Sequence, residues 1–395
     1  MTDPWLTIIG IGEDGLAGLG HASRSALASA HSIFGGPRHL ELAEAGERCE
    51  PWPQPFSLDP VLARRGEPTI VLASGDPFWH GVGGSLARHL DPSEWVCHPA
   101  PSTFSLAAAR LGWRLEETIC LGLHAAPFSR LRPVLSKGVR AICLVRDGEA
   151  VGALAAWLCE HGFGPSELMV LEALGGGDER VRRASAEGFA LADIRAPVAV
   201  AIDTVGTGGL PRASGLPDDL FAHDGQITKR PMRAITLSTL GPRPGELLWD
   251  IGTGSGSISI EWLLAAPGTR AVALEADATR AARAGENAER FGVGHRFELV
   301  HARAPDGLGG LPQPDVVFVG GGASEAVLTA LWDAAPAGTR IVVNAVTLET
   351  EALITRFAGE KGGDLLRIAL SEARPLGSKH GWRAAMPVVQ WSVTR

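Results

Sequence analysis

The stretch LLWDIGTGSGSISIEW, residues 247–262, reads as a strand, a tight turn and the start of a helix. Apolar residues lead to Asp250, glycines follow at positions 252, 254 and 256, and an apolar run comes next. Glycine is needed in such a turn because a side chain would block the close approach of the backbone to a ligand. In open α/β sheets, ligands lie at the carboxyl ends of the strands, where these turns occur. The stretch therefore predicts an α/β sheet with a small-molecule site at this turn.

The spacing of the glycines and the acid before them bear on the identity of the ligand. Dinucleotide-binding turns have the spacing G-x-G-x-x-G and hold a pyrophosphate at the helix N-terminus. Here the spacing is G-x-G-x-G, and Asp250 would repel a pyrophosphate but suits the ammonium group of a methionine moiety. Glu275 ends the next predicted strand, where it can accept hydrogen bonds from ribose hydroxyls. We therefore expect S-adenosylmethionine here and keep a nicotinamide-dependent oxidoreductase as the alternative. The residues expected to hold the methyl donor are Asp250, Gly252, Thr253, Gly254, Ser255, Gly256 and Glu275.

The length of the chain, 395 residues, favours two domains rather than one. Both halves alternate short apolar strand-like runs with amphipathic helix-like stretches, which is typical of α/β architecture. Between them, residues 206–222 contain scattered glycine, proline and serine without an apolar period, as a linker does. We therefore predict a first domain at 1–205, a linker at 206–222 and a second domain at 223–395.

The composition is that of a globular enzyme, with 45% apolar and 20% charged residues. A net charge of −8 argues against non-specific binding of nucleic acid. No apolar run approaches the ~18 residues that a transmembrane helix needs, and the start of the chain resembles neither a signal nor a transit peptide. The five cysteines form no CxxC pair, so we interpret them as small buried hydrophobes and expect no metal site. A cytoplasmic location is the simple expectation.

The segment before the glycine turn, HDGQITKRPMRAITLSTL at 223–240, is rich in basic residues and predicts a helix that begins near Pro231. The pattern HDGxITKxxxR, followed by the glycine turn, resembles the decarboxylating precorrin methyltransferases of cobalamin biosynthesis, Rossmann-type domains that act at C-15. The resemblance continues through Glu275, HARAPDGL and PDVVFVGGG. It implies that Ala302 and Arg303 line the adenine of the donor.

The substrate that this resemblance implies is a tetrapyrrole polycarboxylate, which requires local positive charge in its cleft. The candidate catalytic residues are His223, Lys229 and Arg230, with a helix-capping or structural role as the alternative for His223. The candidate substrate-binding residues are Arg233, Asn344, Lys379, His380 and Arg383. For the last three, a solvated hairpin is the alternative.

The first half resembles the tetrapyrrole (class III) methyltransferases along its whole length. The matching segments are IIGIGEDGLAGLG at 8–20, IFGGPRHLEL at 33–42, VLASGDPFWHGVGGSLARHL at 71–90 and HPAPSTFSLAAARLGW at 98–113. In that fold the donor lies in a cleft between two α/β subdomains, and the family's loops imply contacts with it. These contacts are expected at Gly10, Gly12, Gly75, Asp76, Pro77 and Ser102. Glu13 and Asp14 replace the glycine and proline of many relatives, and Arg38 and His39 are candidates either for the cleft or for a capping or surface role.

The two resemblances cover nearly the whole chain, and their order is that of the precorrin-6Y C-5,15-methyltransferases (decarboxylating). The resemblance implies two S-adenosylmethionine sites, with methylation of precorrin-6B at C-5 by the first domain. The second domain would methylate C-15 and decarboxylate the C-12 acetate, giving precorrin-8. Methyl transfer mainly requires alignment of donor and nucleophile, so acid–base machinery can be sparse. The alternatives are the same chemistry on cobalt-precorrins and a first domain that only binds and delivers substrate. Self-association of relatives implies a homo-oligomer, with neither a nucleic acid nor a membrane as partner.

Overall fold

The computed structural model describes residues 4–395, which form two compact units. The first unit comprises residues 4–128 and 134–209, and the second comprises Ser129–Pro133 and Leu210–Arg395. In the part of the chain that the structure describes, no helix is long and apolar enough to cross a membrane.

The segment 206–222, which was predicted to be a linker, is divided between the two units. Its larger part packs as part of the second unit, where Leu216 and Phe221 are buried in an apolar core with helix α7 (Arg230–Leu240). The glycine and proline content therefore marks irregular backbone, but two apolar side chains fix this backbone to the second unit.

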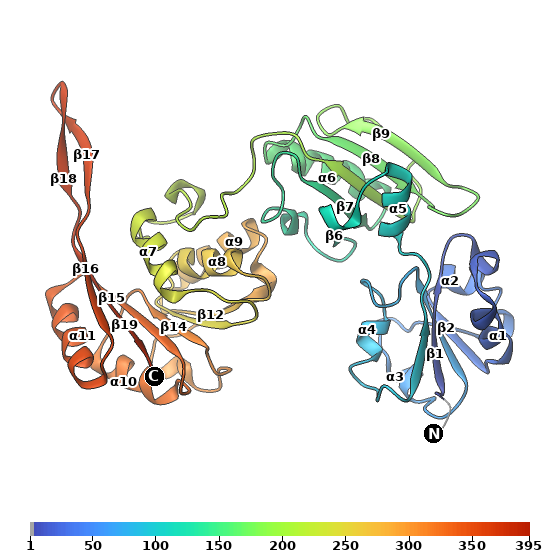
Figure 1. Cartoon of the computed structure of the whole chain (residues 1–395), viewed down its shortest axis with the longest axis horizontal. Coiled ribbons are helices and arrows are strands. Elements are labelled where there is room, and N and C mark those ends of the chain that lie inside the picture. Colours follow the sequence, from blue (N-terminus) through green and yellow to red (C-terminus); the bar gives the residue numbers. More distant parts are fainter. Residues whose placement is uncertain (1–3) are drawn as a thin grey trace. The chain divides into compact units, whose positions relative to one another are not determined.

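The first unit contains a five-stranded parallel sheet in the order β3-β2-β4-β1-β5 (Figure 1). Its strands are β1 (Leu6–Ile11), β2 (Ser32–Gly35), β3 (Cys49–Pro51), β4 (Thr69–Ser74) and β5 (Trp95–His98). Its helices are α1 (His21–Ser29), α2 (Pro37–Leu42), α3 (Asp59–Leu62) and α4 (Gly83–Leu86). Strands β1 and β4 are buried almost throughout because both faces of the sheet are covered.

A second five-stranded sheet of the first unit has the order β6-β7-β10-β8-β9. Only the pair β6–β7 is parallel. The strands are β6 (Thr118–Gly122), β7 (Arg140–Val145), β8 (Glu167–Glu172), β9 (Arg180–Ser185) and β10 (Val198–Asp203), and the helices are α5 (Thr103–Leu111) and α6 (Gly148–Glu160). Ser102 and Asp147 cap the two helices, each accepting a backbone N–H three residues on.

The second unit is built on a seven-stranded sheet in the order β13-β12-β11-β14-β15-β19-β16. The first five of these strands are parallel, and β19 runs antiparallel to both β15 and β16. The strands are β11 (Leu247–Ile251), β12 (Arg270–Glu275), β13 (Phe297–His301), β14 (Val316–Val319), β15 (Arg340–Ala345), β16 (Asp364–Ile368) and β19 (Val388–Thr394). The resemblance to Rossmann-type methyltransferases implies a sheet of this kind with a terminal antiparallel hairpin. In the structure, β19 is the antiparallel strand, and β16 at the edge runs parallel to the first five.

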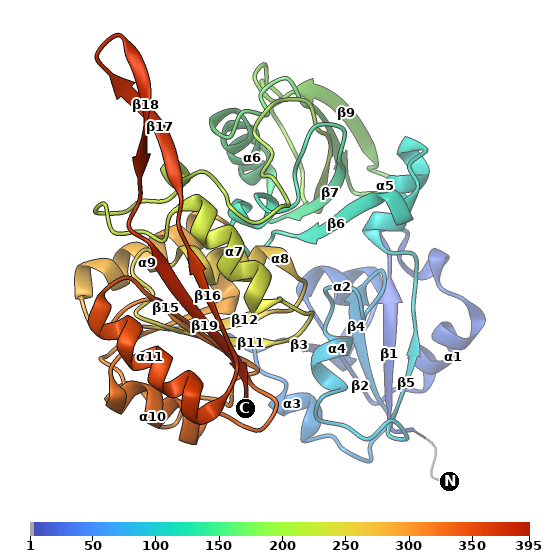
Figure 2. The ribbon, with the colours of Figure 1, turned by 60° about the vertical axis from the view of Figure 1, so that its left-hand side comes forward.

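Helices cover both faces of the seven-stranded sheet (Figure 2). Helices α7, α8 (Ser257–Ala265) and α9 (Ala278–Arg290) pack on one face, and α10 (Glu325–Ala334) and α11 (Leu348–Lys361) pack on the other. Side chains of β11 alternate between the two cores: Trp249 lies with α10 and α11, whereas Leu248 lies with α7 and α8. This double covering explains why β11 is apolar without alternation.

A two-stranded ribbon, β17 (Ser371–Leu376) and β18 (Lys379–Ala384), projects from the end of the sheet (Figure 1). The terminal hairpin implied by the resemblance was expected at 374–393, but these residues belong to two features, the ribbon and strand β19 of the main sheet. Most side chains of the ribbon are exposed, including Leu376 and Trp382.

Candidate functional site

In the second unit, the predicted strand, turn and helix are β11, the glycine turn and α8. The three glycines of the turn have the positive φ angles that glycine permits. Gly252, Gly254 and Gly256 have φ of +70°, +59° and +77°. A Cβ on Gly252 would lie 2.7 Å from the carbonyl oxygen of Gly321, so two backbone segments meet there without room for a side chain. The turn borders a cavity of about 940 Å³ at the carboxyl ends of the parallel strands.

Asp250 is almost completely buried and supports the turn from beneath. Its Oδ2 accepts hydrogen bonds from the hydroxyls of Thr253 and Ser259, both at 2.6 Å. Burial raises the pKa of Asp250 despite these two hydrogen bonds. Asp250 and Gly256 do not border the cavity, whereas the other predicted donor residues of this unit, Gly252, Thr253, Gly254, Ser255, Glu275, Ala302 and Arg303, do.

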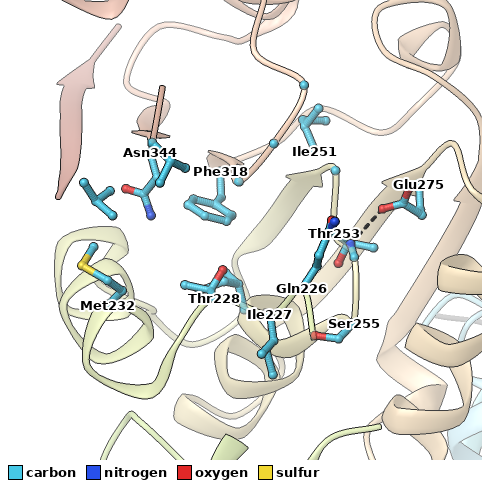
Figure 3. Close-up of a pocket in the computed structure, with 18 of the residues that line it drawn as sticks. Gln226, Ile227, Thr228, Met232, Ile251, Thr253, Ser255, Glu275, Phe318 and Asn344 are labelled. Carbon is cyan, nitrogen blue, oxygen red and sulfur yellow. Dashed lines mark hydrogen bonds between the residues drawn. The ribbon is translucent and has the colours of Figure 1, made fainter. Parts of the chain in front are cut away.

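Glu275 joins the glycine turn to the cavity (Figure 3). Its Oε2 accepts a hydrogen bond from the backbone of Gly254 at 2.9 Å, and its Oε1 accepts one from Asp277 at 3.0 Å. Each carboxylate oxygen keeps a free lone pair. Ser255 Oγ is also buried here, without a hydrogen-bond partner among the described residues. A polar ligand in the cavity would satisfy this hydroxyl, so the walls suit the predicted donor.

The opposite part of the cavity is formed by residues that the sequence reasoning did not single out (Figure 3). They are Gln226, Ile227, Thr228, Met232 and Phe318. The first three belong to the segment HDGQITK, in which only His223 and Lys229 were predicted to belong to the site. Phe318 lies on β14 next to the glycine turn, and nothing in its local sequence distinguishes it from a core residue.

Asn344, at the end of β15, borders the cavity and belongs to a buried polar network. Its Nδ2 donates to Thr236 Oγ1 at 3.0 Å, and its Oδ1 accepts from Gln390 Nε2 at 2.9 Å. Thr239 in turn donates to Gln390 Oε1 at 2.8 Å. These bonds fix the orientation of the Asn344 amide and leave one of its N–H groups available.

Three basic side chains border the second unit's cavity: Lys229, Arg280 and Arg303. Arg280 pairs with Asp224 at 2.9 Å, whereas no ion pair within the described residues involves Lys229 or Arg303. Unpaired cations in a cavity are available for the carboxylates of a ligand.

Arg233, which was predicted to bind substrate, has a different environment. Its side chain is fully buried and pairs with Glu261, with 2.5 Å between Nε and Oε1. It also pairs with Asp218 and donates to the carbonyl of Leu216. These contacts hold the 210–221 segment against α7 and α8, so we do not include Arg233 in the proposed site.

The remaining predicted residues of the second unit do not border its cavity. His223 accepts a hydrogen bond from the backbone of Gly225 at 3.0 Å, and Arg230 is exposed at the start of α7. Lys379, His380 and Arg383 lie on the projecting ribbon.

The first unit has a cavity of its own, of about 510 Å³, between its two sheets. Gly12, Gly75 and Ser102 border it, whereas Gly10, Asp76 and Pro77 do not. A Cβ on Gly10 would lie 1.8 Å from the carbonyl oxygen of Gly75, which places the end of β1 directly against the loop after β4. Asp76 accepts a hydrogen bond from the backbone of Phe78 at 2.9 Å and so shapes this loop. The cleft between two subdomains is thus present in the predicted place.

Family models match both units. A model described as tetrapyrrole (corrin/porphyrin) methylases matches residues 6–190, and one described as a precorrin methyltransferase domain matches residues 219–395. A "Precorrin-6Y C(5,15)-methyltransferase [decarboxylating]" of Sinorhizobium sp is 49% identical over 100% of this chain and 97% of its own length. The protein of the same name from Mycobacterium tuberculosis (strain CDC 1551 / Oshkosh) is 41% identical over 99% of this chain and 100% of its own. Among solved structures, the C-terminal domain of the Rhodobacter capsulatus precorrin-6Y C5,15-methyltransferase is 50% identical, covers 47% of this chain and 100% of its own, and has a TM-score of 0.46.

Proposed function

Because the chain belongs to the family of the precorrin-6Y C(5,15)-methyltransferases (decarboxylating), we propose that its two units carry separate S-adenosylmethionine sites. The first unit methylates precorrin-6B at C-5. The second methylates C-15 and removes the carboxyl group of the C-12 acetate, which gives precorrin-8. The observation that carries this division is that each unit has its own glycine-lined cavity at the carboxyl ends of parallel strands.

In the second unit we assign donor binding to the glycine turn and Glu275. S-Adenosylmethionine supplies an electrophilic methyl group when bound there. Glu275 offers lone pairs to ribose hydroxyls, and Ser255 offers its unpaired hydroxyl. Lys229 and Arg303 bind substrate carboxylates, and the remaining N–H of Asn344 orients a carboxylate or a ring carbonyl. Decarboxylation then requires orientation and desolvation of the acetate, with the macrocycle accepting the electron pair.

The test uses two cavity-filling variants of the full chain. In Gly321→Val, the new side chain enters the second cavity, because no atom lies within 4 Å of the Cβ position and no positive φ opposes valine. In Gly12→Val, the new Cβ lies 2.7 Å from Oδ1 of Asp14 at the wall of the first cavity, so the Asp14 side chain must move. The matched controls are Gly20→Val and Gly309→Val. At both positions no atom lies within 4 Å of the new Cβ, and neither glycine borders a cavity.

Products from cobalt-free precorrin-6B are followed by mass spectrometry. Gly12→Val should abolish the C-5 methyl group alone, and Gly321→Val should abolish the C-15 methyl group and the loss of carbon dioxide. Both controls should give the wild-type product. If Gly12→Val still adds both methyl groups, the first unit is a binding and delivery module. Activity on the cobalt-containing substrate alone would assign the chain to the cobalt-dependent chemistry.

A further inference from the structure

A cluster of four polar residues lies on the wall of the first cavity, beside the loop proposed to hold the donor. Arg38 and His39 come from α2, Ser74 ends β4 directly before Gly75, and Glu13 follows β1. Three chain segments thus bring a guanidinium, an imidazole, a hydroxyl and a carboxylate together at the place where β1 and β4 end. None of the donor contacts expected from the resemblance uses them.

The hydrogen bonds of the cluster determine which atom carries which proton. Arg38 Nη2 lies 2.9 Å from Ser74 Oγ and 3.1 Å from His39 Nε2, and a guanidinium can only donate. With Arg38 as donor, Nε2 of His39 is the acceptor, which assigns the ring proton to Nδ1, a buried atom without a hydrogen-bond partner among the described residues. Ser74 Oγ lies closer to the same Nε2, at 2.7 Å, so the Ser74 hydroxyl is the main donor to its single lone pair and the Arg38 N–H shares that lone pair. Ser74 Oγ accepts from Arg38 and keeps one lone pair for the cavity, to which its side chain is exposed.

The charges around the pair keep the imidazole neutral. Burial, and then the nearby Arg38 charge, lower the pKa of His39 to about 4. Glu13 pairs with Arg38 and balances its charge. The other titratable groups that border this cavity are His80, His124 and Arg146. His39 is therefore unprotonated at neutral pH, and its lowered pKa makes it a weak base.

The proposed reaction of this unit releases a proton. When a ring carbon that bears hydrogen attacks the methyl group, its π electrons form the new C–C bond, and the S–CH₃ pair leaves with sulfur. The macrocycle becomes a cation and must lose the hydrogen of that carbon to restore its π system. Such a C–H is strongly acidic, so a weak base is sufficient.

We propose that Ser74 and His39 form the proton relay of the first unit: Ser74 Oγ removes the proton from the newly methylated ring carbon while its own proton passes to Nε2 of His39. The C–H electron pair returns to the ring, and the imidazolium later releases the proton to water. Arg38 is a positioning residue, because it holds Ser74 Oγ and sets the tautomer of His39. This inference rests on the proposed C-5 methylation by the first unit.

The test uses the full chain and compares Ser74→Ala with His39→Gln. Glutamine can still accept a hydrogen bond from Ser74 but cannot take up a proton. His39→Gln therefore keeps any structural role of His39 and removes only the proton relay. Both variants should lower the rate of C-5 methylation by about 100-fold or more, the range of general base catalysis, and leave C-15 methylation unchanged. With precorrin deuterated at C-5, His39→Gln should show a primary isotope effect that exceeds that of the wild type.

The pH profile gives a second, independent readout. Arg38→Gln removes a charge that lowers the pKa of His39 and leaves Glu13 beside it, so the acid limb of C-5 methylation should move to higher pH. Wild-type rates in His39→Gln, or an unmoved acid limb in Arg38→Gln, would overturn the relay. Failure of the proposed function gives a different result, because Gly12→Val would then still add the C-5 methyl group. In that case the relay is also ruled out, since it requires C-5 methylation by the first unit.

Discussion

The two cavities are held together in different ways. In the first unit, the wall is made by backbone segments that touch: Gly10 lies against Gly75, and a Cβ on Gly75 would lie 2.8 Å from the carbonyl oxygen of Pro101. In the second unit, close backbone contact occurs at Gly252 and Gly321, but buried polar side chains also support the structure around the cavity. They include the bond from Thr253 to Asp250 beneath the glycine turn and the ion pair of Arg233 with Glu261 behind α7 and α8. Close backbone contact tolerates few side chains, whereas a buried polar network fails when one partner is lost. The two units should therefore respond differently to substitution.

The largest expected effect is that of Arg233→Met in the second unit. Glu261 would keep the backbone N–H groups of Gly215 and Leu216 as partners but lose its only cationic partner among the described residues. Breaking a buried ion pair from one side typically costs about 3–5 kcal/mol. Hydrogen exchange followed by mass spectrometry should show lost protection in β11 and α8, with no change in the first unit.

The matched control for that variant is Arg230→Met, an exposed arginine in the same helix without an ion pair in the described chain. It should leave protection in β11 unchanged. Equal loss of protection in both variants would contradict the view that the buried pair, rather than helix α7 as such, stabilises the unit.

The next largest effect is expected for Glu275→Gln, which tests a difference in ligand contacts. Glu275 in the second cavity keeps free lone pairs, whereas Glu13 in the first is paired with Arg38. A hydrogen bond to a charged group contributes about 1.5–3 kcal/mol, so the affinity for S-adenosylmethionine should fall by about 10- to 100-fold. Calorimetric titration in the Gly12→Val background reports on the second site alone.

The control for this titration is Glu286→Gln, an exposed acid on α9 that does not border the cavity. It should bind the donor with the affinity of the background variant. An unchanged affinity in Glu275→Gln would mean that the acid shapes the turn without touching the ribose.

A smaller effect is expected for Gln390→Ala, which removes the donor to Asn344 Oδ1. Loss of this neutral hydrogen bond, worth ~1 kcal/mol, should slow C-15 methylation and decarboxylation by about fivefold, because only the bond to Thr236 then orients the Asn344 amide. Thr239→Val removes only the outer bond of the same network and should cost less. A larger loss in Thr239→Val than in Gln390→Ala would place the important contact elsewhere.

The comparison also shows what the sequence could predict. The glycine turn and Glu275 were predicted because the spacing of these residues depends on local backbone geometry. The central strands were predicted from their apolar runs. Strand β9, RVRRAS, was missed because it has no apolar run: Arg180 and Arg182 both bind the buried Glu172 of the neighbouring strand β8, each with 3.0 Å from Nε to Oε1. Arg233 was misplaced because a basic residue near a cavity does not reveal the buried acid that it pairs with.

The smallest effect concerns the loop that leads to the second cavity. Hydrogen bonds from the backbone of Gln226 and from Arg280, with the charges of Arg280 and Arg283, lower the pKa of Asp224 to about 2. The folded-state pKa is thus below the usual value, so this stabilisation is present above pH ~4 and is lost as pH falls towards 2. At pH 6, Asp224→Asn should unfold at a slightly lower urea concentration than the wild type, and the difference should shrink at pH 3. Because these groups are exposed, the effect at pH 6 should also weaken in high salt. A difference that grows towards acid would show that Asp224 is not an ionised partner of Arg280, and that the loop is held by its backbone, as the wall of the first cavity is.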